Sequence, residues 1–124
     1  MILIIGGAYQ GKTAYARERF GLEDDNIFDL STGQPVKPYL CFTRLECLTK
    51  AEYKKGSSAE EIAQMVRSFA SDPILISREI GSGIVPMDRD SRAWREQHGK
   101  VLQLLAKEAD SVIRIFCTIP EVLK

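Results

Sequence analysis

Residues 1–20 read MILIIGGAYQGKTAYARERF, an apolar run followed at once by a glycine-rich turn and a lysine. The run does not alternate with polar residues, which predicts a strand over Ile2–Ile5 buried on both faces. The pattern from Lys12 to Phe20 predicts a helix, with Gly21 as its stop. A buried strand that leads through glycines into a helix is typical of a loop that binds phosphate.

The turn between that strand and that helix, GGAYQGKT, matches the pattern G-x-x-x-x-G-K-[ST]. Glycines let the backbone approach a phosphate chain, and the following helix offers unpaired N–H groups and a positive dipole end. In this pattern the lysine reaches the β- and γ-phosphates, and the last hydroxyl holds Mg²⁺. The sequence therefore predicts a site for ATP or GTP with Mg²⁺, formed by Gly6, Gly7, Ala8, Tyr9, Gln10, Gly11, Lys12 and Thr13.

Strands and helices alternate along the rest of the chain. Ser57 and Ser58 each precede a glutamate by three residues, which predicts a helix start, and a long helix is expected over residues 89–107. Three further short strands are expected, at Ile27–Leu30, Ile74–Ser77 and Val112–Cys117. This alternation predicts an α/β fold, a P-loop NTPase-like three-layer domain with a small, mainly parallel sheet, over residues 1–124.

The stretch from Tyr39 to Lys55 fits two interpretations. Apolar and polar positions at Cys41, Leu45 and Leu48 follow helical spacing, which favours a helix. A strand across Tyr39 to Leu45 is the alternative.

The bulk composition excludes some classes of protein. Lysine plus arginine equals aspartate plus glutamate, 17 each, so bulk electrostatics do not favour a nucleic-acid binder. No apolar run approaches the roughly 20 residues of a membrane span, and the N-terminus lacks the basic flank of a signal peptide. Cys41, Cys47 and Cys117 lack metal-type spacing and fit poorly with disulfides, so we expect a cytoplasmic protein with cysteines as apolar filler.

A phosphate loop needs an acid to complete its metal site. Ligands of an open α/β sheet gather at the carboxyl ends of the strands. Glu79 follows the convincing strand ILIS and is the preferred candidate, both as a metal ligand and as a catalytic residue beside Lys12. Asp29, at the end of a weaker strand, is the second candidate.

A second unusual stretch, EIGSGIVPMDRDSRAWRE, occupies residues 79–96. Its two glycines predict a mobile loop that can close over a substrate. Arginines neutralise charge spread over phosphate oxygens, which makes Arg78, Arg92 and Arg95 candidate phosphate contacts. The other interpretation is a plain connection followed by a solvated arginine face.

These stretches together resemble the adenosylcobinamide kinase / adenosylcobinamide-phosphate guanylyltransferase family of cobalamin biosynthesis. The resemblance covers residues 1–20 and 74–117, with ILIIGGAYQGKT, SREIGSGIVP and RAWREQHGKVLQLLAKEADSVIRI as its motifs. The family carries a glycine-rich N-terminal loop and an Asn-Glu-Val-Gly-x-Gly-Ile-Val-Pro signature. Identical to the family pattern are Glu79, Gly81, Gly83, Ile84, Val85, Pro86, Arg92, Arg95, Gly99, Val101, Gln103, Ala109, Asp110 and Val112.

The resemblance implies a homo-oligomeric enzyme that binds a nucleoside triphosphate and a corrinoid. The family is longer in the middle, where it holds the histidine that accepts a guanylyl group. This chain has no histidine between Phe20 and Ile74, so the covalent route lacks its acceptor there. The spacing of the one histidine, His98, indicates the edge of an apolar helix face. LECLT at residues 45–49 is similar to the family's acidic strand end, but the helical spacing around it favours coincidence.

The sequence thus favours a kinase that transfers a phosphoryl group to adenosylcobinamide or a related corrinoid. A nucleotide-binding module without catalysis is the alternative that the missing middle segment favours. A kinase for another small alcohol is the third hypothesis, because the corrinoid pocket could belong to the missing segment.

Overall fold

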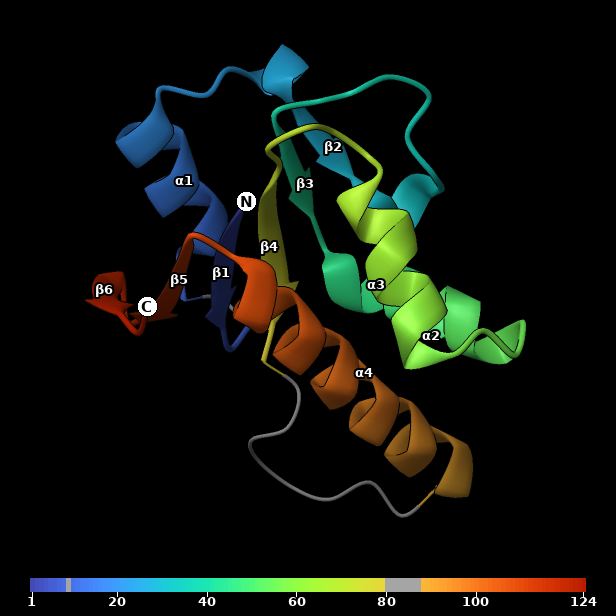
Figure 1. Ribbon diagram of the computed structural model, residues 1–124. Coiled ribbons are helices and arrows are strands. Elements are labelled where there is room, and N and C mark those ends of the chain that lie inside the picture. Colours follow the sequence, from blue (N-terminus) through green and yellow to red (C-terminus); the bar gives the residue numbers. More distant parts are fainter. Residues whose placement is uncertain (9, 80–87) are drawn as a thin grey trace.

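The computed structural model describes residues 1–8, 10–79 and 88–124. Its described strands form one six-stranded sheet in the order β2-β3-β4-β1-β5-β6 (Figure 1). Every neighbouring pair is parallel except β5 and β6, which form an antiparallel hairpin. The strands are β1 (Ile2–Gly6), β2 (Ile27–Asp29), β3 (Cys41–Thr43), β4 (Ile74–Arg78), β5 (Ser111–Phe116) and β6 (Ile119–Val122).

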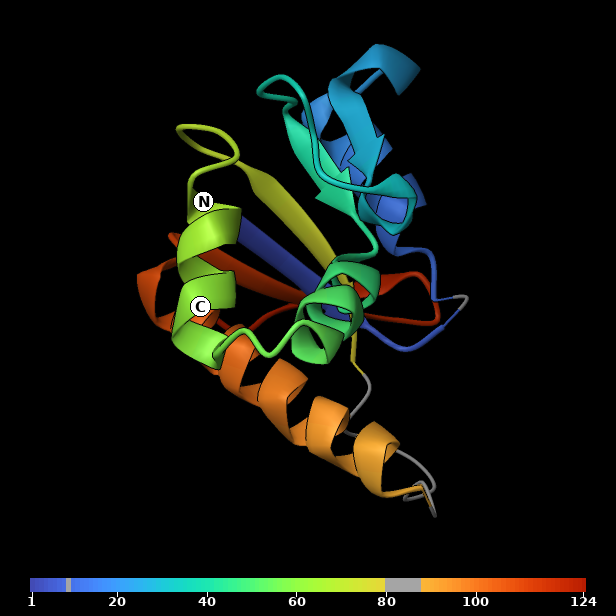
Figure 2. The same ribbon diagram turned by 90° about the vertical axis from the view of Figure 1, so that its right-hand side faces the viewer.

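Helices cover both faces of the sheet, which makes the three layers that the sequence predicts (Figures 1 and 2). Helix α1 (Lys12–Phe20) lies alone on one face. On the other face lie α2 (Leu45–Lys54), α3 (Ala59–Arg67) and α4 (Arg89–Glu108). None of these helices combines the length and the apolar character that crossing a bilayer requires.

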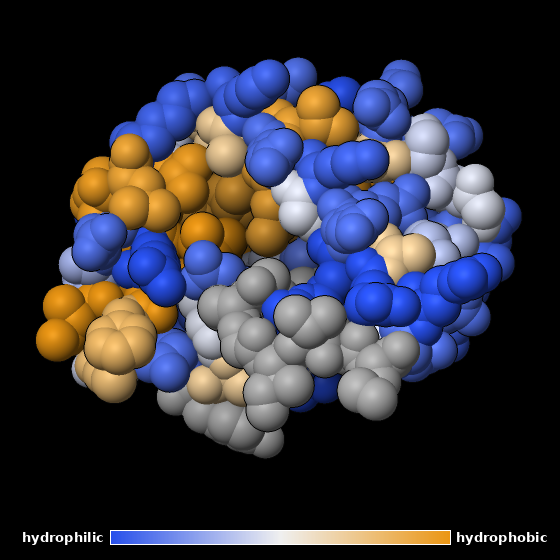
Figure 3. Space-filling model, turned by 90° about the horizontal axis from the view of Figure 1, so that it is seen from below, coloured by the Kyte–Doolittle hydropathy of each residue, from blue (hydrophilic) through white to orange (hydrophobic). Residues whose placement is uncertain are grey.

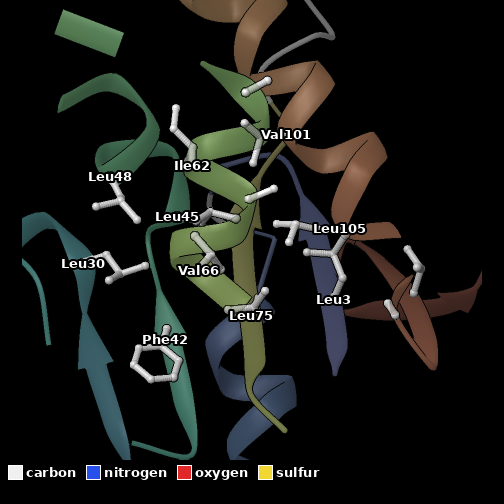
Figure 4. Packing of buried hydrophobic residues seen from close by; sticks show 14 residues of the cluster. Leu3, Leu30, Phe42, Leu45, Leu48, Ile62, Val66, Leu75, Val101 and Leu105 are labelled. Carbon is white, nitrogen blue, oxygen red and sulfur yellow. The ribbon is translucent and has the colours of Figure 1, made fainter. Parts of the chain in front are cut away.

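The sheet separates two apolar clusters, because successive side chains of a strand point to opposite faces. Leu3 of β1 belongs to the cluster under α2, α3 and α4, shown in Figure 4. The next residue, Ile4, packs on the opposite side against Ala16 of α1. Both strand residues are at most 1% exposed, and burying such a side chain contributes about 2 kcal/mol. The prediction of a strand buried on both faces is confirmed.

Local signals place several element ends correctly. Gly21 takes a left-handed conformation, with φ 63°, and ends α1 as predicted. Ser58 caps α3 and exchanges hydrogen bonds with Glu61, so the predicted capping box is present. The glycine loop predicted after Glu79 lies at residues 80–87, outside the described residues.

One expectation about secondary structure is wrong where the alternative strand across Tyr39 to Leu45 is right in part, and one strand was not predicted. Cys41 does not begin a helix but lies in β3, and α2 begins only after Arg44, whose φ of 58° turns the chain between the two. The hairpin partner β6 is absent from the predicted strands. Its two-residue turn, Cys117 and Thr118, has positive φ at both positions (49° and 65°) without the asparagine or glycine that signals such a turn.

Candidate functional site

The predicted phosphate loop connects β1 to α1 at the carboxyl end of a central strand. Gly11 caps the helix with φ 88°, a conformation that favours glycine. The Lys12 ammonium turns back and donates a hydrogen bond to the carbonyl oxygen of Gly7 at 2.7 Å. The lysine is thus held over the loop rather than extended into solvent, as a phosphate-binding lysine should be.

The β5–β6 turn supports the loop from the other side. The backbone N–H of Thr118 donates to the carbonyl oxygen of Gln10 at 3.0 Å, and the N–H of Cys117 donates to the Gln10 side-chain oxygen. A Cβ on Gly11 would meet the Thr118 methyl group at 3.2 Å. The hairpin that sequence patterns missed therefore fixes the shape of the loop that they found.

A cavity of about 640 Å³ opens beside the loop. It lies at the carboxyl ends of the parallel strands, the end seen from below in Figure 3. Four of its described lining residues are cationic and one is acidic, which attracts an anionic ligand. These charged residues are Lys12, Arg44, Lys50, Arg78 and Glu46.

Three of the residues lining the cavity, Glu46, Arg78 and Trp94, come from α2, β4 and α4; we call them the cavity wall. Glu46 accepts a hydrogen bond from the backbone N–H of Arg78 at 2.8 Å, which ties α2 to the end of β4. Burial lowers the pKa of Lys12; Arg78 lowers it further and Glu46 opposes both. These charge effects place Glu46 and Arg78 within electrostatic reach of the lysine.

Glu46 lines the cavity but is not among the site residues predicted from the sequence. The motif LECLT carries a signal for this acid, but the helical spacing around it favours coincidence. Both features are real, because β3 ends at Thr43 and α2 begins at Leu45. Glu46 therefore both follows a strand closely and lies in the first turn of a helix.

Glu79, the acid predicted for the metal, lies elsewhere. Its backbone N–H donates to the carbonyl oxygen of Gly6 at 2.7 Å, directly beside the loop. Its carboxylate accepts a hydrogen bond from Arg114 of β5 at 3.1 Å. Glu79 is not among the described residues that line the cavity. Asp29, the second candidate, caps the turn at Leu30–Thr32 by accepting from the N–H of Ser31.

A buried polar network lies beneath the wall. Trp94 donates from its ring N–H to the Thr49 hydroxyl at 3.2 Å, and that hydroxyl is 2.8 Å from Nδ1 of His98. The other ring nitrogen, Nε2, lies 3.0 Å from the Ser77 hydroxyl and 3.2 Å from the carbonyl oxygen of Arg78. His98 is 0% exposed, so it is buried in the core, and burial lowers its pKa.

Comparison with protein families assigns the chain. The sequence model of the family described as cobinamide kinase / cobinamide phosphate guanyltransferase matches residues 39–123, more than half of the chain. The chain belongs to this family. A search of curated proteins found no match. The resemblance noted in the sequence is thereby confirmed at the family level.

The matched range shows which elements of the chain resemble the cobinamide kinase family. It includes residues 45–49, so the LECLT stretch lies inside the matched range, as do β4 and α4. The phosphate loop precedes the matched range. The family comprises nucleotide-using kinases and guanyltransferases that act on cobinamide, and its fold is that of P-loop NTPases, in agreement with the sheet and layers described above.

The remaining predicted residues divide between the cavity and its surroundings. Arg78 lines the cavity, whereas Arg92 and Arg95 in the first turns of α4 are not among its described lining residues. Tyr9 lies outside the described residues. Among the rest of the loop, Ala8, Gln10, Gly11, Lys12 and Thr13 line the cavity.

The donor set of this cobinamide kinase family member fits Mg²⁺ rather than a soft metal. Thr13 and Glu46 offer hydroxyl and carboxylate oxygens, the ligands that Mg²⁺ takes alongside substrate phosphates. Burial raises the pKa of the Cys47 thiol, which therefore lines the cavity as a neutral group. The described residues hold no cluster of three or more histidine, cysteine or acidic side chains of the kind that binds a metal by itself.

Proposed function

We propose that this chain is a nucleoside-triphosphate-dependent kinase that phosphorylates the aminopropanol hydroxyl of adenosylcobinamide. The observation that carries the proposal is one cavity lined by Lys12, Thr13 and Glu46, a cation, a hydroxyl and a carboxylate from two helices. These are the groups that phosphoryl transfer uses. Membership of the cobinamide kinase family supports the choice of acceptor.

Each residue has a defined task in the proposed transfer. The acceptor oxygen forms a bond to the γ-phosphorus, the bond from that phosphorus to the β–γ bridging oxygen breaks, and the hydroxyl proton leaves to solvent. Lys12 stabilises the charge on the γ-phosphoryl oxygens. Thr13 and Glu46 would hold Mg²⁺, which would supply positive charge beside the leaving diphosphate. In the alternative assignment, which the sequence favours, Glu79 instead of Glu46 would hold the metal.

We further propose that this chain does not transfer guanylyl groups through a histidine. His98 is the only histidine of the chain, and it is 0% exposed. Its ring nitrogens lie within hydrogen-bond distance of Thr49, Ser77 and the Arg78 carbonyl oxygen. A nucleophile must present a free lone pair to the phosphorus, which this ring does not do.

Two alternative functions have their own support. A nucleotide-binding module without catalysis is favoured by the short middle of the chain, because no histidine stands between Phe20 and Ile74. A kinase for another small alcohol is favoured by the same shortness, since part of the corrinoid site could be missing with it. Both alternatives keep the nucleotide at the phosphate loop.

A thermal-shift screen combined with a turnover assay separates these functions. ATP and GTP with Mg²⁺ should each be tested at millimolar concentration, with and without adenosylcobinamide. A ligand that binds the native state raises Tm. At 100 times its Kd the ligand raises the free energy of unfolding by about 2.7 kcal/mol. A shift plus turnover supports the kinase. A shift without turnover across cobinamide substrates supports the module, and turnover only with another alcohol supports the third function.

No shift with any triphosphate would overturn all three functions. The variant Lys12→Met serves as the control, because it keeps the side-chain length and removes the charge that faces the phosphates. A Tm shift of the same size in this variant would show that the nucleotide binds elsewhere.

A homo-oligomer and a cytoplasmic location remain part of the proposal. Large apolar side chains are exposed on and beside β6, with Phe116 at 63% and Val122 at 69%, and hydrophobic atoms gather on that side in Figure 3. Such a patch on an edge strand favours association. Light scattering after gel filtration measures the mass in solution. The three cysteines are free, which fits a reducing compartment.

A further inference from the structure

A second cavity, of about 720 Å³, lies between α2 and the start of α4. Two residues, Lys50 and Trp94, line both this cavity and the phosphate cavity. The Lys50 ammonium lies 5.3 Å from the centre of the Trp94 ring, so the two side chains form a single partition. Among the described lining residues, this pair is the part that the two cavities share.

The two cavities differ in charge. The phosphate cavity has four cationic and one acidic residue among its described lining residues. The second cavity has two of each, namely Lys50, Lys54, Asp88 and Asp90. A balanced set of charges gives no advantage to a polyphosphate, whereas it offers both donors and acceptors to a neutral polar ligand.

The aromatic residues define the rest of that ligand. Tyr53 and Trp94 line the second cavity together, one from α2 and one from α4. Aromatic rings bind flat or bulky apolar groups, and pockets combine such rings with a few polar side chains that fix orientation. Primary amides need a donor and an acceptor at once, which lysines beside aspartates supply.

The partition is held in place from below. The Trp94 ring N–H donates to Thr49, a hydroxyl that is 1% exposed and also contacts His98. A buried hydrogen bond of this kind orients the indole, because breaking it leaves a polar group unpaired. Trp94 therefore presents fixed ring faces rather than a mobile side chain.

We propose that the second cavity, lined by Tyr53, Lys54, Asp88, Asp90, Lys50 and Trp94, binds the acceptor, a bulky alcohol that carries carboxamide groups. The acceptor hydroxyl passes the Lys50–Trp94 partition to reach the γ-phosphate. This inference rests on the proposed kinase function and adds to it the place and the chemistry of acceptor binding.

Steady-state kinetics of the full chain with adenosylcobinamide test the inference through Tyr53, which lines only the second of the two cavities. In Tyr53→Leu the KM for adenosylcobinamide should rise about 10-fold, since a lost aromatic contact is worth about 1.4 kcal/mol. The KM for the nucleotide and kcat at saturating acceptor should stay unchanged. Tyr53→Phe keeps the ring and should remain within about 3-fold of the original protein.

A second pair of variants guards against a folding defect in Tyr53→Leu. Lys54→Gln removes a charge from the second cavity, and Lys107→Gln removes an exposed charge from the last turn of α4 as its matched control. Only the first should raise the KM for adenosylcobinamide, by about 3-fold. Binding is read independently by quenching of Trp94, the only tryptophan of the chain, on titration with the corrinoid alone.

The outcomes separate the two levels of the argument. Turnover of adenosylcobinamide with an unchanged acceptor KM in both Tyr53→Leu and Lys54→Gln overturns the second cavity and leaves the kinase intact. A protein that neither binds nor phosphorylates adenosylcobinamide overturns both. A rise in the nucleotide KM equal to that of the acceptor also overturns the assignment, because the two ligands would then share one site.

Discussion

The phosphate loop and the cavity wall face the same cavity but are built in opposite ways. The loop is one contiguous stretch, residues 6–13, and much of what it offers a phosphate is backbone N–H groups. The wall consists of Glu46, Arg78 and Trp94, side chains from three elements that only the sheet and its helices bring together.

This difference implies a division of labour. Backbone donors bind any polyphosphate tail, so the loop accounts for binding but not for the choice of reaction. Under the proposed function, the side chains of the wall would distinguish a kinase from a nucleotide-binding module, and one acceptor from another. Variants of the loop should therefore affect nucleotide binding, whereas variants of the wall should affect turnover more than nucleotide binding.

The largest expected effect belongs to Lys12, where loop and cavity meet. Lys12→Met should lower kcat/KM for the nucleotide by roughly 1000-fold, because a charge placed on the transferring group is lost. Steady-state kinetics measure the change, and the Tm without ligand should stay close to that of the original protein. Retention of full activity would remove the loop from the mechanism.

The two glutamates give the sharpest test of the wall. Glu46→Gln should lower kcat about 100-fold, since a carboxylate that holds the metal becomes neutral while the acceptor for the Arg78 N–H remains. Glu79→Gln should stay within about 3-fold, because its carboxylate pairs with Arg114 rather than lining the cavity. The reverse result would assign the metal to Glu79.

Gly6 and Gly7 test how tightly the loop is fixed to the sheet. A Cβ on Gly6 would lie 2.6 Å from the carbonyl oxygen of Ile115, a backbone atom that cannot move aside. Gly6→Ala should therefore lower the free energy of unfolding by about 2 kcal/mol. In the matched variant Gly7→Ala the new atom meets only the Gln10 side chain, at 3.7 Å, and stability should hardly change. Urea unfolding compares the two.

The network under the wall predicts a dependence of stability on pH. Burial lowers the pKa of His98 in the folded protein. At mildly acidic pH the unfolded chain therefore binds a proton on this residue that the folded chain does not bind. This contribution is fully present above the unfolded pKa of about 6.5 and declines as pH falls below it, by at most about 1.4 kcal/mol per pH unit. Urea unfolding from pH 7.5 to 5 measures the slope. In His98→Gln the slope should flatten.

The smallest effect is expected at the turn that supports the loop. Cys117 and Thr118 both adopt a left-handed conformation that asparagine and glycine tolerate better. The double variant Cys117→Asn, Thr118→Gly should raise the free energy of unfolding by about 1 kcal/mol. Thermal unfolding tests this, and a lower Tm would show that the loss of the Thr118 side chain costs more stability than the relief of strain contributes.

Where a helix or strand has a local sequence signal, the sequence predicts the element and its boundaries. Such signals depend on residues close together in the sequence. Examples are the strand at Ile2, the helix from Lys12 to Gly21 and the capping box at Ser58. Prediction failed where the decisive contact is distant in sequence. β3 is a three-residue strand whose stability comes from pairing with β2 and β4, which short-range periodicity cannot detect.

The candidate site was predicted in the same uneven way. The loop residues are predicted from a pattern of fixed spacing, and five of them line the cavity. Glu46 lines the cavity and Glu79 is not among its described lining residues, although both follow strands. Sequence alone does not say toward which side of the sheet end each carboxylate points. Arg114, the partner of Glu79, lies 35 residues further along the chain.

By itself the sequence determined the layered α/β architecture and the kinship with the cobinamide kinase family, and it predicted the phosphate loop, because glycine conformations, helix caps and apolar periodicity are local properties. The tertiary structure decided which acid faces Lys12, which side chains line the cavity beside it and how Trp94 is anchored. Those relations are set by strand order and helix packing, and they join residues whose distance along the chain carries no signal of their contact.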